Sequence, residues 1–219
     1  MENASKALLM AGGVLIALLV IGALMLMFNQ LSSYQTSKSD TEVVDSISKY
    51  NEQFTRFADD YTKGYELITL MNKVIDNNQK TGIVDSVNFS DEYNITIKIT
   101  LGTEFRKKYG ITDKTLFDKD VYEIKDKSAT FYKNVIQKFS DLETTYTLNV
   151  MSKLSANYDS IKNGDKTIKE ITGKDININS DTIAQYREYS DFKTSTFKIK
   201  NIDYYKNGQI KSLSFEFKE

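Results

Sequence analysis

The chain has 219 residues and a formal net charge of −1, from 29 basic and 30 acidic side chains. This balance provides no basic surface for nucleic acid, so we expect no nucleic-acid partner. The chain contains no cysteine and no histidine, which excludes disulfides, thiolate chemistry, histidine-based triads and the usual zinc sites.

An uncharged apolar segment is the first feature along the chain. The 22 residues Ala7–Phe28 contain nothing more polar than glycine, and about 20 helical residues cross the ~30 Å hydrocarbon layer of a membrane. A cleaved secretory signal has a shorter apolar region, about 7–15 residues, and small residues at its cleavage site, where this chain has Met25, Met27 and Phe28. We therefore predict a retained transmembrane helix at residues 7–28; a cleaved signal and a buried core helix are the alternatives.

The flanks of this segment predict its orientation. Residues 1–6 carry Lys6 and the α-amino group against Glu2, whereas the other flank has no charge before Lys38. By the positive-inside rule, residues 1–6 form a short cytoplasmic tail. Residues 29–39 are then a juxtamembrane tether or an extension of the helix, and residues 40–219 form an extracytoplasmic domain of a single-pass cell-membrane protein. A cysteine-free domain of this kind is ordinary for a bacterium.

Two helices are predicted next. Asp40 is a candidate N-cap for the first, whose apolar residues recur at helical spacing: Val43, Val44, Ile47, Tyr50 and Phe54. The second runs from about Thr62 to Asn78, before Gly82, and its apolar face contains Tyr65, Leu67, Ile68, Met71, Val74 and Ile75.

Strands follow these helices. The stretch "GIVDSVNF" (82–89) alternates weakly, and "NITIKITL" (94–101) alternates strictly between apolar and polar residues. With "SDEY" as the turn between them, the pattern predicts an antiparallel hairpin that is buried on one side.

The middle of the chain is more ambiguous. A short helix ending at Gly110 and a second helix with Phe131, Val135, Ile136 and Phe139 on one face are expected. Residues 144–154 alternate like a strand, yet they also continue the helical stripe through Tyr146, Val150 and Leu154. The β-branched threonines favour the strand.

The last residues predict a second hairpin. Asn207-Gly208 suits a two-residue type I′ turn. Pairing outward from this turn places Ile202 opposite Leu213, and a β-bulge at Lys200 or Asn201 then pairs Ile199 with Phe215 and Phe197 with Phe217. The predicted fold class is α+β: a transmembrane helix, amphipathic helices and an antiparallel sheet that ends in a hairpin.

Two stretches contain acidic and amide side chains of the kind that bind calcium. The first contains Asp118, Asp120 and Glu123, and the second contains Asp175, Asn177, Asn179 and Asp181. An EF-hand loop beginning at Asp175 would need glycine where Ser180 lies and glutamate where Tyr186 lies. We interpret these side chains as solvated loop carboxylates and expect no metal and no cofactor. Because no stretch has a catalytic signature, we expect no enzymatic activity.

Two sets of residues are candidates for contact with partners. Small residues in the apolar segment let helices approach closely in lipid, and the candidates for helix packing are Ala7, Ala11, Gly13, Ala17 and Gly22. The aromatic run near residue 190 suits either an interface or a core, and its interface candidates are Tyr186, Tyr189 and Phe192. The expected partners are membrane lipid and either a second copy or another helix in the membrane.

The stretch "GGVLIALLVIGAL" (12–24) is similar in texture to the apolar segment of type IV pilins. Together with the expected C-terminal sheet, it resembles the plan of type IV pilins, pseudopilins and tight-adherence pilus proteins, although Ala17 and Leu18 stand where pilins have a glutamate. The stretches "MENASKALLMAGG" and "KNGQI" also resemble uncharacterised single-span proteins of gut Clostridia. The pilin resemblance implies a structural or assembly role at the cell surface; a membrane-anchored binding module is the alternative.

Overall fold

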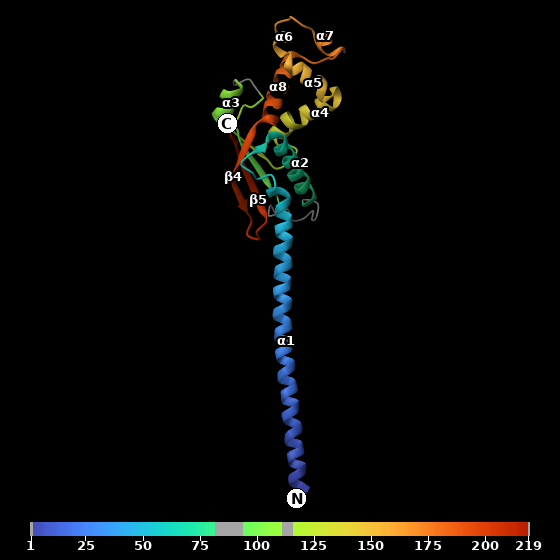
Figure 1. Ribbon diagram of the computed structural model, residues 1–219, viewed down its shortest axis with the longest axis vertical. Coiled ribbons are helices and arrows are strands. Elements are labelled where there is room, and N and C mark those ends of the chain that lie inside the picture. The colour runs from blue at the N-terminus through green and yellow to red at the C-terminus, as the bar shows by residue number, and fades with distance from the viewer. Residues whose placement is uncertain (1, 82–93, 111–115, 219) are drawn as a thin grey trace. The chain divides into compact units, whose positions relative to one another are not determined.

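A computed structural model describes residues 2–81, 94–110 and 116–218. It divides into two units, Met1–Lys49 and Tyr50–Glu219, and we call the second the C-terminal unit. The elements are labelled in Figure 1. In chain order they are α1 (Glu2–Thr55), β1 (Thr62–Lys63), α2 (Gly64–Thr81), β2 (Thr96–Thr100), α3 (Gly102–Tyr109), β3 (Val121–Ile124), the π-helix η2 (Tyr132–Gln137), α4 (Lys138–Tyr146), α5 (Leu148–Ala156), α6 (Tyr158–Lys162), α7 (Ile168–Thr172), α8 (Ser180–Thr194), β4 (Thr196–Tyr204) and β5 (Ile210–Lys218).

Helix α1 continues without interruption from the apolar segment to Thr55. Residues 29–39 are therefore a helix extension, and Asp40 lies inside the helix. The prediction of an N-cap at Asp40 was wrong, because an N-cap residue has non-helical backbone angles. Nothing local opposes the continuous helix, since the chain has no proline and no glycine between Gly22 and Gly64.

The C-terminal unit contains a five-stranded mixed sheet in the order β1-β4-β5-β2-β3. β2 pairs antiparallel with β3 but parallel with β5, with Ile97 beside Leu213 and Ile99 beside Phe215. The expectation of a purely antiparallel sheet was therefore wrong. The parallel partner of β2 lies more than 100 residues later in the chain, so local sequence patterns could not reveal it. The other strand predicted for the first hairpin, residues 82–89, lies outside the described residues.

β4 and β5 pair antiparallel in the predicted register, including Phe197–Phe217, Ile199–Phe215 and Ile202–Leu213. A register shift between Ile199 and Asn201 marks the expected bulge. The strands are joined through the Tyr205–Gln209 segment.

The turn between β4 and β5 differs from the prediction. The Gly208 N–H donates to the Tyr205 carbonyl oxygen at 2.9 Å, and the Tyr205 N–H donates to the Gln209 carbonyl oxygen at 2.8 Å. Gly208 has a φ of 86°, whereas Asn207 is not in the positive-φ region. A type I′ turn needs positive φ at both central residues, so this is the three-residue class of hairpin loop, in which only glycine is left-handed.

The core lies between the apolar face of the sheet and helices α2 and α8, which contact each other. α2 supplies Leu67, Leu70, Met71, Val74 and Ile75, all at most 1% exposed. The predicted apolar face of this helix is thus largely confirmed, although Tyr65 is 54% exposed. The helix begins at Gly64 rather than Thr62 because Thr62 and Lys63 pair with β4 as β1.

The segment 144–154 is helical, so the strand predicted there was wrong. α4 extends to Tyr146 and α5 begins at Leu148, with Met151 and Leu154 buried. The helical stripe noted in the sequence is therefore the structural one, but the helix is broken at Thr147, which has φ 67° and ψ 147°. α5, α6 and α7 gather at one end of the C-terminal unit (Figure 1).

Asn78 is a polar residue that joins α2 to the sheet. It is 9% exposed, and its Nδ2 donates to the carbonyl oxygens of Ile95 at 2.8 Å and Lys125 at 2.7 Å. Its Oδ1 accepts the Ile95 N–H at 2.8 Å. Asn78 therefore satisfies backbone groups at the start of β2 and just after β3, rather than ending the helix.

Candidate functional site

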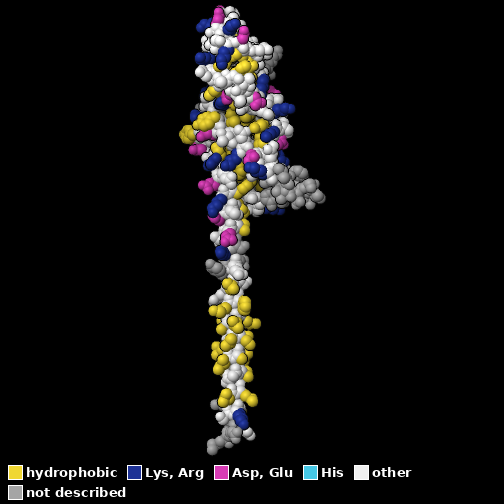
Figure 2. All heavy atoms as spheres, turned by 90° about the vertical axis from the view of Figure 1, so that its right-hand side faces the viewer, with side chains coloured by type: hydrophobic (Ala, Val, Ile, Leu, Met, Phe, Trp, Pro, Cys, Tyr) yellow, Lys and Arg dark blue, Asp and Glu magenta, His cyan; other side chains and the backbone are white. Residues whose placement is uncertain are grey.

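Within the described residues, one helical segment is long and apolar enough to cross a membrane, Ser5–Ser33. None of its most apolar window is buried, and exposed fractions reach 77% at Leu9, 64% at Leu18 and 69% at Phe28. Figure 2 shows apolar side chains along this stretch and charged side chains over much of the visible face of the C-terminal unit. The segment is therefore not a core helix of this chain, and it is compatible with a membrane anchor or a signal sequence.

The small residues of this segment are exposed in the part of the chain that the structure describes. Ala7, Ala11, Gly13, Ala17 and Gly22 are all exposed. A Cβ added at Gly13 or Gly22 would find no atom within 4 Å, apart from the helix's own backbone. These positions are free to accept a second helix, and they remain candidates for that contact.

The aromatic residues near 190 are buried. Tyr186 and Tyr189 are 2% exposed and Phe192 is 0% exposed, because α8 turns these side chains toward the sheet and α4. The ring of Phe139 stacks on Tyr189 at 5.2 Å between centroids. These three side chains are core residues. Because they are buried, they do not form the exposed interface that the sequence suggested for them.

A polar network ties α4 to α8 beside these rings. Glu143 Oε1 accepts hydrogen bonds from the Tyr186 hydroxyl at 2.7 Å and from Lys193 Nζ at 2.8 Å. Burial, reinforced by the Glu143 carboxylate, raises the pKa of Tyr186 above its usual value. The tyrosine is therefore a neutral donor, and its hydrogen bond to Glu143 joins α8 to α4.

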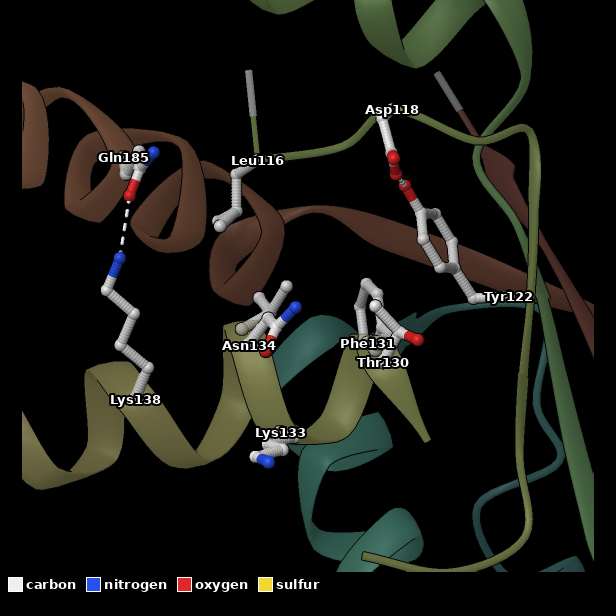
Figure 3. A pocket seen from close by; sticks show the side chains of 10 residues that line it. Leu116, Asp118, Tyr122, Thr130, Phe131, Lys133, Asn134, Lys138 and Gln185 are labelled. Carbon is white, nitrogen blue, oxygen red and sulfur yellow. Dashed lines mark hydrogen bonds between the residues drawn. The ribbon is translucent and has the colours of Figure 1, made fainter. Parts of the chain in front are cut away.

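A hollow of about 440 Å³ lies between η2, the segment before β3, and α8 (Figure 3). Leu116, Phe131 and Val135 supply apolar parts of its wall, and Asp118 and Asn134 supply polar groups. Its size lies in the range of small-molecule sites.

Several polar groups around the hollow are held by partners. The Tyr122 hydroxyl donates to Asp118 Oδ1 at 3.2 Å and accepts the Lys119 N–H at 2.8 Å, and burial raises the pKa of Tyr122 to about 12. Lys138 Nζ donates to Gln185 Oε1 at 2.8 Å. The hollow is therefore lined by a carboxylate, amide groups and lysines beside an apolar wall, and the Tyr122 hydroxyl and Lys138 Nζ already have hydrogen-bond partners.

The π-helix shapes one side of this hollow. On this π-helix, Val135 and Ile136 are each 2% exposed, while Lys133 and Asn134 are exposed. Short π-helical turns are frequent at functional sites. The sequence shows only the apolar spacing of this helix, so neither the hollow nor the π-turn was predicted.

The acidic residues considered as cation ligands are dispersed. Asp120 pairs with Arg106, Glu123 pairs with Lys98 at 3.1 Å, and Asp175 lies 3.4 Å from Lys169. Asn179 instead caps α8, where its side chain accepts the Thr182 N–H at 2.7 Å. The described part of the chain contains no group of three or more acidic, histidine or cysteine side chains that could hold a metal ion.

Comparisons with protein-family models, curated proteins and solved structures find no match to this chain.

Proposed function

We propose that the chain is a non-enzymatic protein anchored in the bacterial cell membrane by residues 7–28, with its C-terminal unit outside the cytoplasm. Its role is structural or assembly-related, in a pilus-like or secretion-like machine. The observation that carries the anchor is the uncharged apolar helix whose side chains are unburied. Exposure of this apolar surface to water would cost free energy, whereas the hydrocarbon layer of a membrane would surround it with apolar groups.

The proposed orientation depends on the flanking charges. Lys6 lies before the segment, and the nearest charge after it is Lys38. Lysine close to a span favours the cytoplasmic side, and large domains translocate largely regardless of their own charge. The composition supports a bacterial envelope, because an extracytoplasmic domain without cysteine is ordinary in a bacterium and unusual in a eukaryote.

The anchor is tested by alkaline carbonate extraction of membranes from a bacterium that expresses the full chain. The wild-type chain should remain in the membrane pellet. A double variant, Val14→Lys with Leu18→Lys, should shift to the supernatant, because each lysine costs about 2.5–3.5 kcal/mol near the centre of a span. Release of the wild-type chain by carbonate would refute the anchor.

The orientation is tested by protease added to intact protoplasts. A tag after residue 219 should be digested, whereas a tag before residue 1 should be protected until the membrane is permeabilised. The reverse pattern would place the C-terminal unit in the cytoplasm.

A second candidate function is an anchored module that binds a small molecule in the hollow beside η2. The observation that favours it is the combination of the hollow with a π-helical wall. Native mass spectrometry of the full chain, purified in mild detergent, should then show a bound small molecule. Asn134→Trp, which fills the hollow, should abolish this mass, whereas Gln137→Trp, on the same helix outside the lining, should retain it. A wild-type chain without a bound mass would leave the assembly role as the better proposal.

A further inference from the structure

The helices α5, α6 and α7, with the segment that follows them, form a strap between α4 and α8 (residues 148–179; Figure 1). α5 contacts both α7 and α8, and α6 contacts α8. The buried side chains Met151 and Leu154 are 0% exposed, and Ile178 is 9% exposed. Apolar packing is thus the main attachment of the strap to the rest of the C-terminal unit.

The strap begins at a strained backbone. Among the described residues, Thr147 is the one non-glycine residue with a positive φ, and its angles of 67° and 147° lie in a region used essentially by glycine. A β-branched side chain makes this conformation especially costly. The strain persists only because the packing of α5 compensates for it.

A relaxed alternative is encoded in the same residues. The apolar stripe of α4 continues into α5 at three- and four-residue steps, through Tyr146, Val150 and Leu154. A continuous helix from α4 into α5 would return Thr147 to ordinary helical angles, but it would remove α5 from α8. The closed arrangement therefore has a strained backbone and a buried α5, whereas the continuous helix has a relaxed backbone and an α5 that is no longer buried against α8.

The strap is also held to α8 by few polar contacts. Arg187 lies 3.8 Å from Asp159 in an exposed ion pair between α8 and α6. Exposed pairs of this kind contribute little to stability. A region that is held by few strong contacts opens locally at a lower free energy than the core of a sheet.

Within the strap, by contrast, polar contacts are local. Thr167 and Glu170 form a capping box on α7, and the Asp165 N–H donates to the Ser160 carbonyl oxygen at 2.9 Å. At the far end, Gly173 ends α7 with a φ of 70° and irregular backbone leads to the cap of α8 at Asn179. The strap can therefore move with part of its internal structure retained.

We propose that residues 148–179 are a latch that opens at Thr147 while the sheet remains folded. Opening lets α4 and α5 straighten and uncovers the side of α8 that carries Tyr186. The backbone strain at Thr147 lowers the free energy that is needed to open the latch. The segment after Gly173 provides the second hinge.

Hydrogen–deuterium exchange on the full-length chain in mild detergent tests the latch. Amides of α5 should exchange faster than those of β4 and β5 in the wild-type chain. Thr147→Gly removes the strain of the closed state and disfavours the straight helix, so it should slow exchange in α5 by about tenfold. Thr144→Gly is the matched control at an exposed position inside α4, where the Thr144 hydroxyl donates to the Ser140 carbonyl oxygen at 3.0 Å, and it should not slow exchange.

Two outcomes of this experiment would overturn the latch. One is α5 exchanging at the rate of the β4–β5 amides in the wild-type chain, which would mean that the strap opens only on global unfolding. The other is an unchanged α5 exchange rate in Thr147→Gly.

Thiol labelling provides an independent measurement, because the chain has no cysteine of its own. Met151→Cys and Leu213→Cys each place one thiol at a position that is 0% exposed, in the strap and in β5 respectively. The strap thiol should react at least tenfold faster than the sheet thiol under native conditions. Equal labelling rates would overturn the proposal.

Discussion

Asn51, near the end of α1, is hydrogen-bonded to Gly208 in the turn between β4 and β5. The Asn51 Nδ2 donates to the Gly208 carbonyl oxygen at 2.8 Å, and its Oδ1 accepts the Ile210 N–H at 3.0 Å. One amide side chain thus satisfies backbone groups on both sides of the turn. Phe54, one turn later on the helix, is 1% exposed in the core, so the end of α1 is an integral part of the C-terminal unit.

The first prediction concerns this contact. Asn51→Ala should lower the free energy of unfolding of the full chain by about 1–3 kcal/mol, because both backbone partners lose their bonds in a partly buried site. Denaturant unfolding in mild detergent measures the effect. Gln53→Ala, at an exposed position on the same helix, is the control and should change stability by less than about 0.5 kcal/mol. Similar losses in the two variants would argue against a specific role for Asn51.

The second prediction concerns the close approach of α2 to the end of α8. A Cβ at Gly64 would lie 1.9 Å from the carbonyl oxygen of Phe192, a backbone atom that cannot rotate away. Gly64→Ala should therefore destabilise the chain by about 3 kcal/mol or more. Gly110→Ala is the comparison: its φ is 63° and nothing lies within 4 Å of the added Cβ, so only backbone strain of about 1–2 kcal/mol is expected. If thermal unfolding gave the two variants equal stability, the backbone clash would not be the dominant cost.

The third prediction is a pH dependence at Glu188. Burial raises the pKa of this carboxyl above its ordinary value, with a smaller contribution from Asp191. A raised folded-state pKa means that the folded chain binds the proton more tightly, so the ionised form destabilises the fold once the pH exceeds the folded-state pKa, and this cost disappears below the unfolded-state pKa.

Glu188→Gln removes this ionisation. The glutamine Oε1 can still accept the Leu116 N–H, which the carboxylate accepts at 3.0 Å. The variant should be more stable than the wild type at pH 7, and the difference should vanish at acid pH. Urea unfolding from pH 3 to pH 7 measures this trend, with Glu52→Gln at an exposed position as the control. A difference that grew at acid pH would have the wrong sign.

The fourth prediction concerns the small residues of the span and depends on the proposed assembly role. Ala11→Ile with Gly22→Ile should separate two packed helix backbones and reduce crosslinking of the full chain in membranes, because helix association in lipid depends on close van der Waals contact. Insertion should be preserved, since isoleucine is apolar. Leu15→Ile with Leu19→Ile is the control, and equal crosslinking in both double variants would make the segment a passive anchor.

Local sequence patterns were sufficient for several elements. The register of the final hairpin follows from the alternation of Phe197, Ile199, Phe215 and Phe217, because the side chains of a strand alternate between two faces and a slip by one residue would expose the apolar set. The same reasoning required the bulge before Asn201, which the structure contains. The uninterrupted apolar run at residues 7–28 likewise predicted a long apolar helix, which the structure contains.

Other features depended on contacts between distant parts of the chain. The threonines around residue 145 favour a strand locally, but Met151 and Leu154 gain burial against α8 only if the segment is helical. The same packing holds Thr147 at a strained φ that no local preference would select. Tyr186, Tyr189 and Phe192 could form an exposed platform or a core from their spacing alone, and α4 and the sheet decided in favour of the core.

The sequence by itself determined where the apolar segment lies, roughly where α2 and β2 begin, and how the last two strands pair, because each of these depends on residues close together in the chain. Only the tertiary structure decided that β5 runs parallel to β2, that Asn78 joins α2 to the sheet, and that a hollow forms beside η2. These features bring together groups that lie far apart in the sequence, in the case of β2 and β5 by more than a hundred residues. Their free energy comes from burial and hydrogen bonding that exist only once the whole C-terminal unit has folded.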